Sequence, residues 1–324
     1  MFSAFGVENP LMDIIAHVEF SLLTALGKKP GTMNLVDYEE IERIRSGISE
    51  LHRMPGGSCA NTMRGIAWLN RTAEIPAPVF NGSVGRDAIG DSYVSAIEEC
   101  GVRAAITRKD SATGTSLILV TPDGERTMNT FLGACRAFGP ADLDLDRLAD
   151  SKILHLTGYL WDTENQRKAA EAAVVLAEKK GIPISFDLAD PFAVQKYGAS
   201  YLPFIRESVD VLFANREELS LLTATTCDED CIDAASTLCP TVIMKSGARG
   251  CYLSIGGTIA CIPGVPARQV LDTTGAGDAF AAGYLYGVLT GREPASCAAL
   301  ANGIASKIVG VEGCDYEAID AAGL

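Results

Sequence analysis

From about residue 79 onward, short β-rich runs alternate with amphipathic helical stretches, and this alternation constrains the fold more than any other feature. The expected strands span residues 79–84, 152–157, 183–187, 209–214, 241–245 and 250–255, and the expected helices span 88–100, 163–180, 216–223, 277–290 and 293–309. Near-continuous apolar strands that alternate with helices indicate a mostly parallel sheet covered on both faces. We therefore expect an α/β fold, a three-layer α/β/α sandwich.

Two regions interrupt the alternation. Residues 10–55 show strand-like alternation and few helical signals, and residues 115–120 and 125–131 flank the turn Thr121-Pro122-Asp123-Gly124, which is typical of a hairpin. We expect these excursions, approximately residues 11–52 and 108–135, to form a small β-sheet lid on a single domain that spans residues 1–324. Such a lid would cover the carboxyl edge of the sheet, where ligands bind in open α/β folds.

The charge balance limits the partners. With 27 basic and 41 acidic residues the net charge is −14, which argues against nucleic-acid or anionic-membrane binding, because both need a basic face. The chain lacks an apolar run of 18 residues, a basic leader and a C-x-x-C pair. We expect a soluble, cytoplasmic protein with reduced, mostly buried thiols, and the sequence leaves open whether it is a monomer or a homodimer.

The run from Asp272 to Leu285, DTTGAGDAFAAGYL, carries the clearest chemistry. We expect it to follow a strand at residues 267–271 and to open a helix, so that the amides of Gly275, Ala276 and Gly277 bind an anion. Asp278 then lies in the first helical turn, where a carboxylate would accept the proton of an attacking hydroxyl during phosphoryl transfer. The alternative is an ordinary helix start with a favourable acidic residue. Neither a dinucleotide fingerprint nor a Walker loop occurs.

This run resembles the C-terminal signature D-T-x-G-A-G-D-A-F-x-x-G of the ribokinase-like (PfkB) kinases. Three further motifs are similar to that family and follow its order: PGGSCAN at residues 55–61, NREE at 215–218 and KSGARG at 245–250. The resemblance extends over residues 9–310. It implies a ribokinase-like fold and an ATP-dependent kinase whose acceptor is an alcohol group.

The resemblance also implies roles for individual residues. Asp278 would be the general base, the amides of residues 275–277 the anion hole, and Asn215 and Glu218 would organise Mg²⁺, mainly through water. The ATP-binding residues would be Asn215, Ser246, Gly247, Gly250 and Asn302, and a monovalent cation such as K⁺ would bind Asp272 and Thr274. From spacing alone, Asn215 and Glu218 fit a helix cap equally well, and Asn302 fits a polar position on an alanine-rich helix.

For the acceptor, the resemblance implies a clamp formed by Asn9, Asp13, Gly57, Ser58 and Asn61. It also implies a lid arginine, Arg126, and apolar surface from Leu132, Tyr159 and Leu160. Without the resemblance, an Asp such as Asp13 is more often a solvent-facing charge on an edge strand, and each apolar residue is more often part of the core. The alternative for Arg126 is a solvated charge on the hairpin.

Several runs, including NPLMD at residues 9–13, GYLW at 158–161 and DLADPF at 187–192, resemble the adenosine kinases of the family. They favour the 5′-hydroxyl of a nucleoside as acceptor, adenosine first and inosine or guanosine next. A kinase for ribose, fructose or a keto-deoxy sugar acid would keep the same motifs. A catalytically silent ligand-binding relative would keep the fold.

Overall fold

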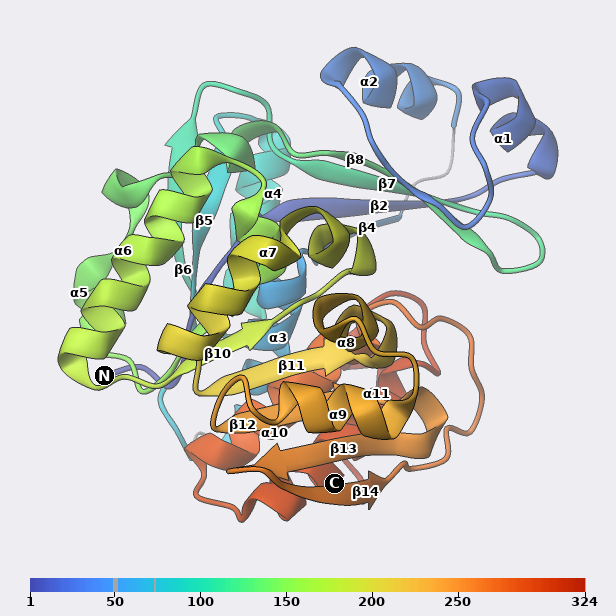
Figure 1. Cartoon of the computed structure of the whole chain (residues 1–324). Helices are drawn as coiled ribbons and strands as arrows, with labels where there is room; N and C mark the ends of the chain where they lie inside the picture. Colours follow the sequence, from blue (N-terminus) through green and yellow to red (C-terminus); the bar gives the residue numbers. More distant parts are fainter. Residues whose placement is uncertain (49–51, 73, 324) are drawn as a thin grey trace.

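A nine-stranded sheet forms the centre of the computed structural model, which describes residues 1–48, 52–72 and 74–323 (Figure 1). Its strand order is β14-β13-β12-β11-β10-β9-β1-β5-β6, parallel except at the antiparallel pairs β12–β13 and β13–β14. The strands are β1 (Phe5–Val7), β5 (Val79–Gly85), β6 (Arg103–Lys109), β9 (Leu154–Thr157), β10 (Ile184–Asp187), β11 (Val211–Asn215), β12 (Thr241–Lys245), β13 (Gly250–Ile255) and β14 (Thr258–Pro263). The predicted parallel sheet is confirmed.

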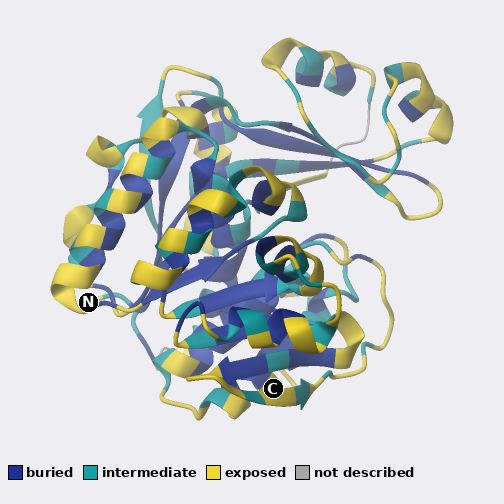
Figure 2. Cartoon of the chain, in the orientation of Figure 1, coloured by how far each residue is buried: buried dark blue, intermediate teal, exposed yellow. Residues whose placement is uncertain are grey.

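Helices cover both faces of this sheet, so the three-layer sandwich is confirmed as well. One hydrophobic core lies beneath α3 (Ser58–Leu69), α4 (Ala88–Glu99), α10 (Ala276–Leu289) and α11 (Pro294–Ile308). A second core lies beneath α5 (Leu145–Ala149), α6 (Glu164–Lys180), α7 (Pro191–Ser208), α8 (Arg216–Thr223) and α9 (Asp228–Ala235). Figure 2 shows the strands buried between exposed outer helix faces.

Local sequence signals explain the helix ends. Thr163 caps α6 by accepting from the Gln166 amide, and Gly181 ends the helix in the left-handed conformation at φ 66°. Small residues in α10 let it pack closely on its neighbours. A Cβ on Gly283 would come within 2.8 Å of the Ala301 Cα in α11, which fixes glycine at this position.

A separate five-stranded sheet, ordered β3-β8-β7-β2-β4, projects from the core (Figure 1). It comprises β2 (Leu11–His17), β3 (Met33–Leu35), β4 (His52–Gly56), β7 (Thr115–Val120) and β8 (Arg126–Phe131), with α1 (Phe20–Leu26) and α2 (Tyr38–Ser46) between its first strands. These strands lie within or next to the segments expected for the lid, of which residues 49–51 are outside the described residues. The predicted hairpin is β7–β8.

The expected strand at residues 267–271 is wrong. The segment has no regular secondary structure, and the exposed fractions of Val270 and Leu271 are 67% and 60%. It follows β14, which is already the edge strand, and the Leu271 amide donates to the Val309 carbonyl at the end of α11 instead of to another strand. The sequence patterns also did not predict β1, β6, β14, α3, α5, α7 and α9.

Most of the ten free cysteines are buried, as expected, but Cys227 and Cys261 are exposed. Cys261 lies on the edge strand β14, which packs against the sheet on one side only. Among the described residues, no helix combines the length and the apolar character that a membrane crossing requires.

Candidate active site

The carboxyl ends of the parallel strands carry the polar residues of one cavity of about 660 Å³. Glu8 follows β1, and Asp187, Asn215 and Lys245 end the neighbouring strands β10, β11 and β12. The small sheet and the first turn of α10 complete the walls. Because strand ends in a parallel sheet meet at one edge, residues far apart in sequence converge here.

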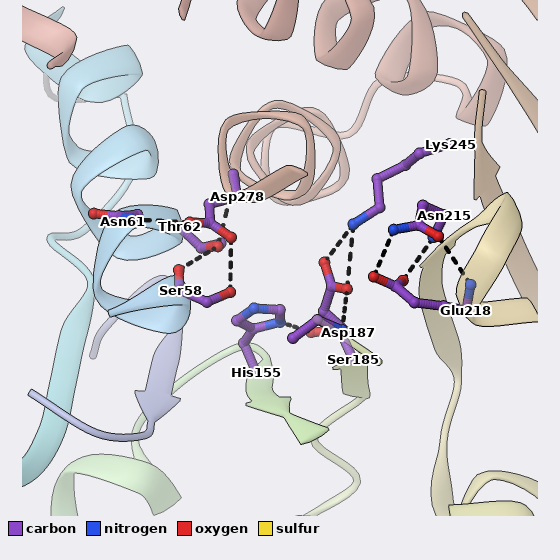
Figure 3. A network of polar contacts seen from close by, with 11 residues as sticks. Ser58, Asn61, Thr62, His155, Ser185, Asp187, Asn215, Glu218, Lys245 and Asp278 are labelled. Carbon is purple, nitrogen blue, oxygen red and sulfur yellow. Dashed lines mark hydrogen bonds and ion pairs between the residues drawn. The ribbon is translucent and has the colours of Figure 1, made fainter. Parts of the chain in front are cut away.

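Asp278 lines this cavity from the first turn of α10 and belongs to a network of polar side chains (Figure 3). Its Oδ1 accepts a hydrogen bond from Ser58 Oγ at 2.7 Å, and its Oδ2 accepts one from Asn61 Nδ2 at 2.9 Å. Burial raises the pKa of Asp278, and these two donors oppose that effect. The first turn of α3 therefore fixes the carboxylate that the sequence singles out.

The glycine-rich turn before Asp278 adopts a conformation that exposes backbone amides. Gly275 is the N-terminal cap of α10 at φ 74°, a left-handed conformation that favours glycine. The Ala276 amide donates to the Thr273 carbonyl at 3.2 Å, so this expected anion-hole donor is engaged. Among the described residues, no such acceptor is found for the amides of Gly275 and Gly277, and both residues line the cavity.

Glu8 is a cavity residue that the sequence analysis missed. Its carboxyl group is buried and accepts a hydrogen bond from the Cys59 amide in the first turn of α3. Ser58 and Asn61, which donate to Asp278, lie in the same turn. Burial raises the pKa of Glu8 to about 8. The signal was present in the sequence, because Glu8 is the charged residue that ends a short apolar strand.

Asp187 and Lys245 were also missed as site residues, although each ends an expected strand. Lys245 Nζ donates to both carboxylate oxygens of Asp187, at 2.9 and 3.2 Å, and both residues line the cavity (Figure 3). His155 lies on β9, next to β10. Its ring is buried, and its Nδ1 is 2.9 Å from Ser185 Oγ. Burial lowers the pKa of His155 to about 4, which makes it a neutral core histidine.

Asn215 and Glu218 line the cavity and also form a capping box at the start of α8. The Asn215 amide and Nδ2 both donate to Glu218 at 2.7 Å, and the Glu218 amide donates to Asn215 Oδ1 at 2.9 Å. Burial raises the pKa of Glu218. Both carboxylate oxygens already accept hydrogen bonds, so the pair fits Mg²⁺ held through water rather than by direct ligation. Within the described ranges, no cluster of three His, Cys, Asp or Glu side chains could hold a metal ion.

The acceptor-side residues gather where the two sheets meet. Asn9 Oδ1 accepts from Gln166 Nε2 at 2.5 Å, an arrangement that turns the Asn9 amide nitrogen away from Gln166. Asp13 lies on β2, and burial raises its pKa to about 7. Asn9, Asp13, Gly57, Ser58, Asn61, Leu132 and Tyr159 all line the cavity.

Leu160 is the exception on the acceptor side, and its prediction is wrong. Its side chain is fully buried in the core beneath α6 and α7 and does not line the cavity. Residues 158–161 form a 3₁₀ turn after β9, in which Tyr159 faces the cavity and Leu160 the interior. The turn directs these two consecutive side chains to opposite sides, which the sequence motif does not reveal.

Arg126 joins the small sheet to the loop before α10. Its Nη2 lies 2.5 Å from Asp272 Oδ2, and its Nη1 donates to Thr274 Oγ1 at 3.1 Å. Asp272 and Thr274 are the two residues expected to hold a monovalent cation. In the structure the Arg126 guanidinium already neutralises the Asp272 carboxylate. Neither Arg126 nor Asp272 lines the cavity, which corrects the expected substrate contact of Arg126.

Of the residues expected to bind ATP, some line the cavity and one does not. Gly247, Gly250 and Asn302 line the cavity, whereas Ser246 does not and its hydroxyl is buried. Gly250 has φ 96° and begins β13. Asn302 Nδ2 donates to the Pro263 carbonyl at 3.0 Å, so the amide also fixes the end of β14.

Known proteins share this architecture. The sequence profile of the pfkB family carbohydrate kinases matches residues 22–321. The structure of a probable sugar kinase protein from Rhizobium etli CFN 42 is similar at 33% identity and a TM-score of 0.90, over 97% of this chain and 94% of that one. Adenosine kinase from Sinorhizobium meliloti is similar at 32% identity and 0.89, over 97% and 95%. The adenosine kinase of Saccharomyces cerevisiae is 27% identical over 316 residues, 88% of each chain.

The family profile covers nearly the whole chain, and the two structural similarities extend over both sheets. They agree with the four motifs in family order and with the convergence of those motifs on one cavity. The chain therefore belongs to the pfkB family of carbohydrate kinases, as a ribokinase-like nucleoside or sugar kinase.

Proposed function

We propose that this protein transfers the γ-phosphoryl group of ATP to the 5′-hydroxyl of a nucleoside, with adenosine as the first candidate. One observation carries the proposal: Asp278 is held by Ser58 and Asn61 where the acceptor end of the cavity meets the amides of Gly275 and Gly277. A base and an anion-binding helix start side by side suit phosphoryl transfer to an alcohol.

The acceptor end of the cavity favours a nucleoside over a free sugar. Apolar side chains supply much of its lining there: Leu11, Met33, Leu35, Met128, Leu132 and Phe192, with Tyr159 beside them. A nucleobase would bury its faces against such a surface, whereas a sugar has little apolar area to bury. The adenosine kinases among the relatives support the same choice.

In this mechanism Asp13 and Asn9 orient the sugar hydroxyls of the acceptor. Asp278 takes the proton of the 5′-hydroxyl as the bond to phosphorus forms, and its hydrogen bonds to Ser58 and Asn61 keep it in place. The amides of Gly275 and Gly277 stabilise charge on the transferred group. Mg²⁺, held through water near Asn215 and Glu218, would neutralise phosphate charge when bound.

A sugar kinase is the second candidate, and the similarity to the probable sugar kinase of Rhizobium etli favours it. Asp13, Asn61 and the Asp278 centre would serve a ribose or a fructose equally well. The two functions differ in what fills the apolar end of the cavity.

Release of ADP from MgATP, measured against a panel of nucleosides and sugars, tests the proposal. We expect kcat/KM for adenosine to exceed that for ribose and fructose by at least about tenfold, from burial of the base. Asp278→Asn is expected to lose about 10²–10⁴ in kcat while it keeps the wild-type Tm. Turnover with sugars alone would support the second candidate, and no ADP with any acceptor would refute both.

A further inference from the structure

Lys245 reaches into the cavity from the end of β12 and stops beside the anion-binding turn of α10 (Figure 3). Its Nζ lies 3.1 Å from the position that a Cβ on Gly277 would occupy. A side chain at residue 277 would crowd this ammonium group, which therefore lies directly against the first turn of α10. Lys245 and Gly277 therefore lie next to each other in the wall of the cavity.

The surroundings of Lys245 keep it charged. Its side chain is 13% exposed and that of its partner Asp187 is 3% exposed. Burial by itself would lower the pKa of Lys245, but Asp187 and Glu218 more than offset it, so the pKa is raised. The protein carries a net charge of −14, and Glu8, Asp187, Glu218 and Asp278 all line this cavity. A polyphosphate entering it would need a local cation.

We propose that Lys245 binds a non-bridging oxygen of the γ-phosphoryl group and stabilises its charge during transfer, next to the Gly275 and Gly277 amides. This proposal rests on the kinase function proposed above, and it does not depend on which alcohol is the acceptor. Asp187 is a positioning residue that holds the ammonium group at the turn.

The reaction balances without a change in Lys245. The acceptor oxygen forms its bond to the γ-phosphorus, the bond from that phosphorus to the ADP oxygen breaks, and the hydroxyl proton passes to Asp278. Lys245 keeps its proton throughout. Its ammonium group replaces one of its two hydrogen bonds to Asp187 with a hydrogen bond to the phosphoryl oxygen. A fixed cation that interacts with developing charge is the arrangement that lowers such a barrier.

The alternative is a purely structural Asp187–Lys245 ion pair. Lys245→Met alone would leave Asp187 charged and buried and would destabilise the fold, so the test uses the charge-neutral double variant Lys245→Met/Asp187→Asn. Lys245→Arg retains the positive charge. The charge-neutral double variant Lys109→Met/Asp142→Asn is the matched control, because Lys109 and Asp142 form a half-buried ion pair at 2.7 Å and neither residue lines the cavity.

Two measurements decide between these roles. With whichever nucleoside or sugar the wild type accepts, the double variant should lose about 10²–10³ in kcat with the acceptor KM within about threefold, as for loss of one oxyanion donor. Lys245→Arg should retain part of the kcat that the double variant loses, and the control Lys109→Met/Asp142→Asn should stay within twofold of the wild-type kcat.

Calorimetric binding of MgATP and MgADP without acceptor supplies the second readout. The double variant should lose about tenfold of the wild-type preference for ATP over ADP, because only ATP carries the γ-phosphoryl group that Lys245 contacts. A wild type that consumes only sugars would refute the nucleoside proposal and leave this test intact. An unchanged ATP preference together with a kcat within threefold of wild type would overturn the role of Lys245.

Discussion

Replacement of Glu8 by glutamine should change how the stability of this protein depends on pH. Glu8 is buried, and burial raises its pKa from 4.5 to about 8. The folded protein then keeps a proton that the unfolded chain releases, so the stabilising contribution is fully present below about pH 4.5 and is lost as the pH rises through about 8. Glutamine retains an oxygen that can accept from the Cys59 amide, but it does not titrate.

The expected magnitude follows from the shift. Between pH 5.5 and 7.5 the wild type should lose about 1.4 kcal/mol of unfolding free energy per pH unit through Glu8. Over two units the wild type should therefore lose about 2–3 kcal/mol relative to Glu8→Gln. Asp13, whose pKa burial raises to about 7, titrates in both proteins, so the difference between them largely removes its contribution.

Urea unfolding of both proteins at three pH values measures this difference, with constant m-values as the check on comparable transitions. Glu98→Gln, at an exposed position on α4, is the control and should give a curve parallel to that of the wild type. Parallel curves for Glu8→Gln and the wild type would refute the assignment of a buried, protonated Glu8.

Two further substitutions test the corrected positions. Leu160→Ala should destabilise the protein by about 2–5 kcal/mol, because it opens a hole in the core, and should leave the acceptor KM within about twofold; a large rise in KM at unchanged Tm would return Leu160 to the substrate cavity. Arg126→Gln should cost about 3–5 kcal/mol in urea unfolding, because it leaves the Asp272 carboxylate buried without its partner. Adding Asp272→Asn should recover part of that loss, and strict additivity of the two changes would contradict the ion pair.

Much of the architecture could be predicted because its signals are local. The strands β5, β10, β12 and β13 were expected within one or two residues, since apolar runs bounded by turn residues specify them. The stop of α6 at Gly181 and the β7–β8 hairpin follow from turn and cap chemistry in the same way. The prediction of a strand at residues 267–271 was wrong because a strand needs a neighbouring strand to pair with, and the sequence of the segment does not specify one.

For the candidate site, the motifs predicted some of the residues but not their orientation or their pairing. The motifs identified Asp278, Asn61 and the 275–277 turn, and in the structure all of them line one cavity, with Asn61 Nδ2 2.9 Å from Asp278 Oδ2. The sequence motif did not distinguish Tyr159, which lines the cavity, from Leu160, which is buried in the core. Nor did it indicate that Arg126 pairs with Asp272, because those two residues are 146 positions apart and meet only when the small sheet lies beside the loop.

The sequence by itself therefore determined the sandwich, the glycine-rich turn and the position of its acidic residue, because strand periodicity and glycine conformation are properties of short segments. Only the tertiary structure decided which strand-end charges share one cavity. Glu8 directly follows β1, and Asp187 and Lys245 end β10 and β12; these strands are distant in the chain but close together in the sheet. Burial raises the pKa of Glu8, and the neighbouring carboxylates Asp187 and Glu218 raise the pKa of Lys245; both effects exist only in the assembled fold.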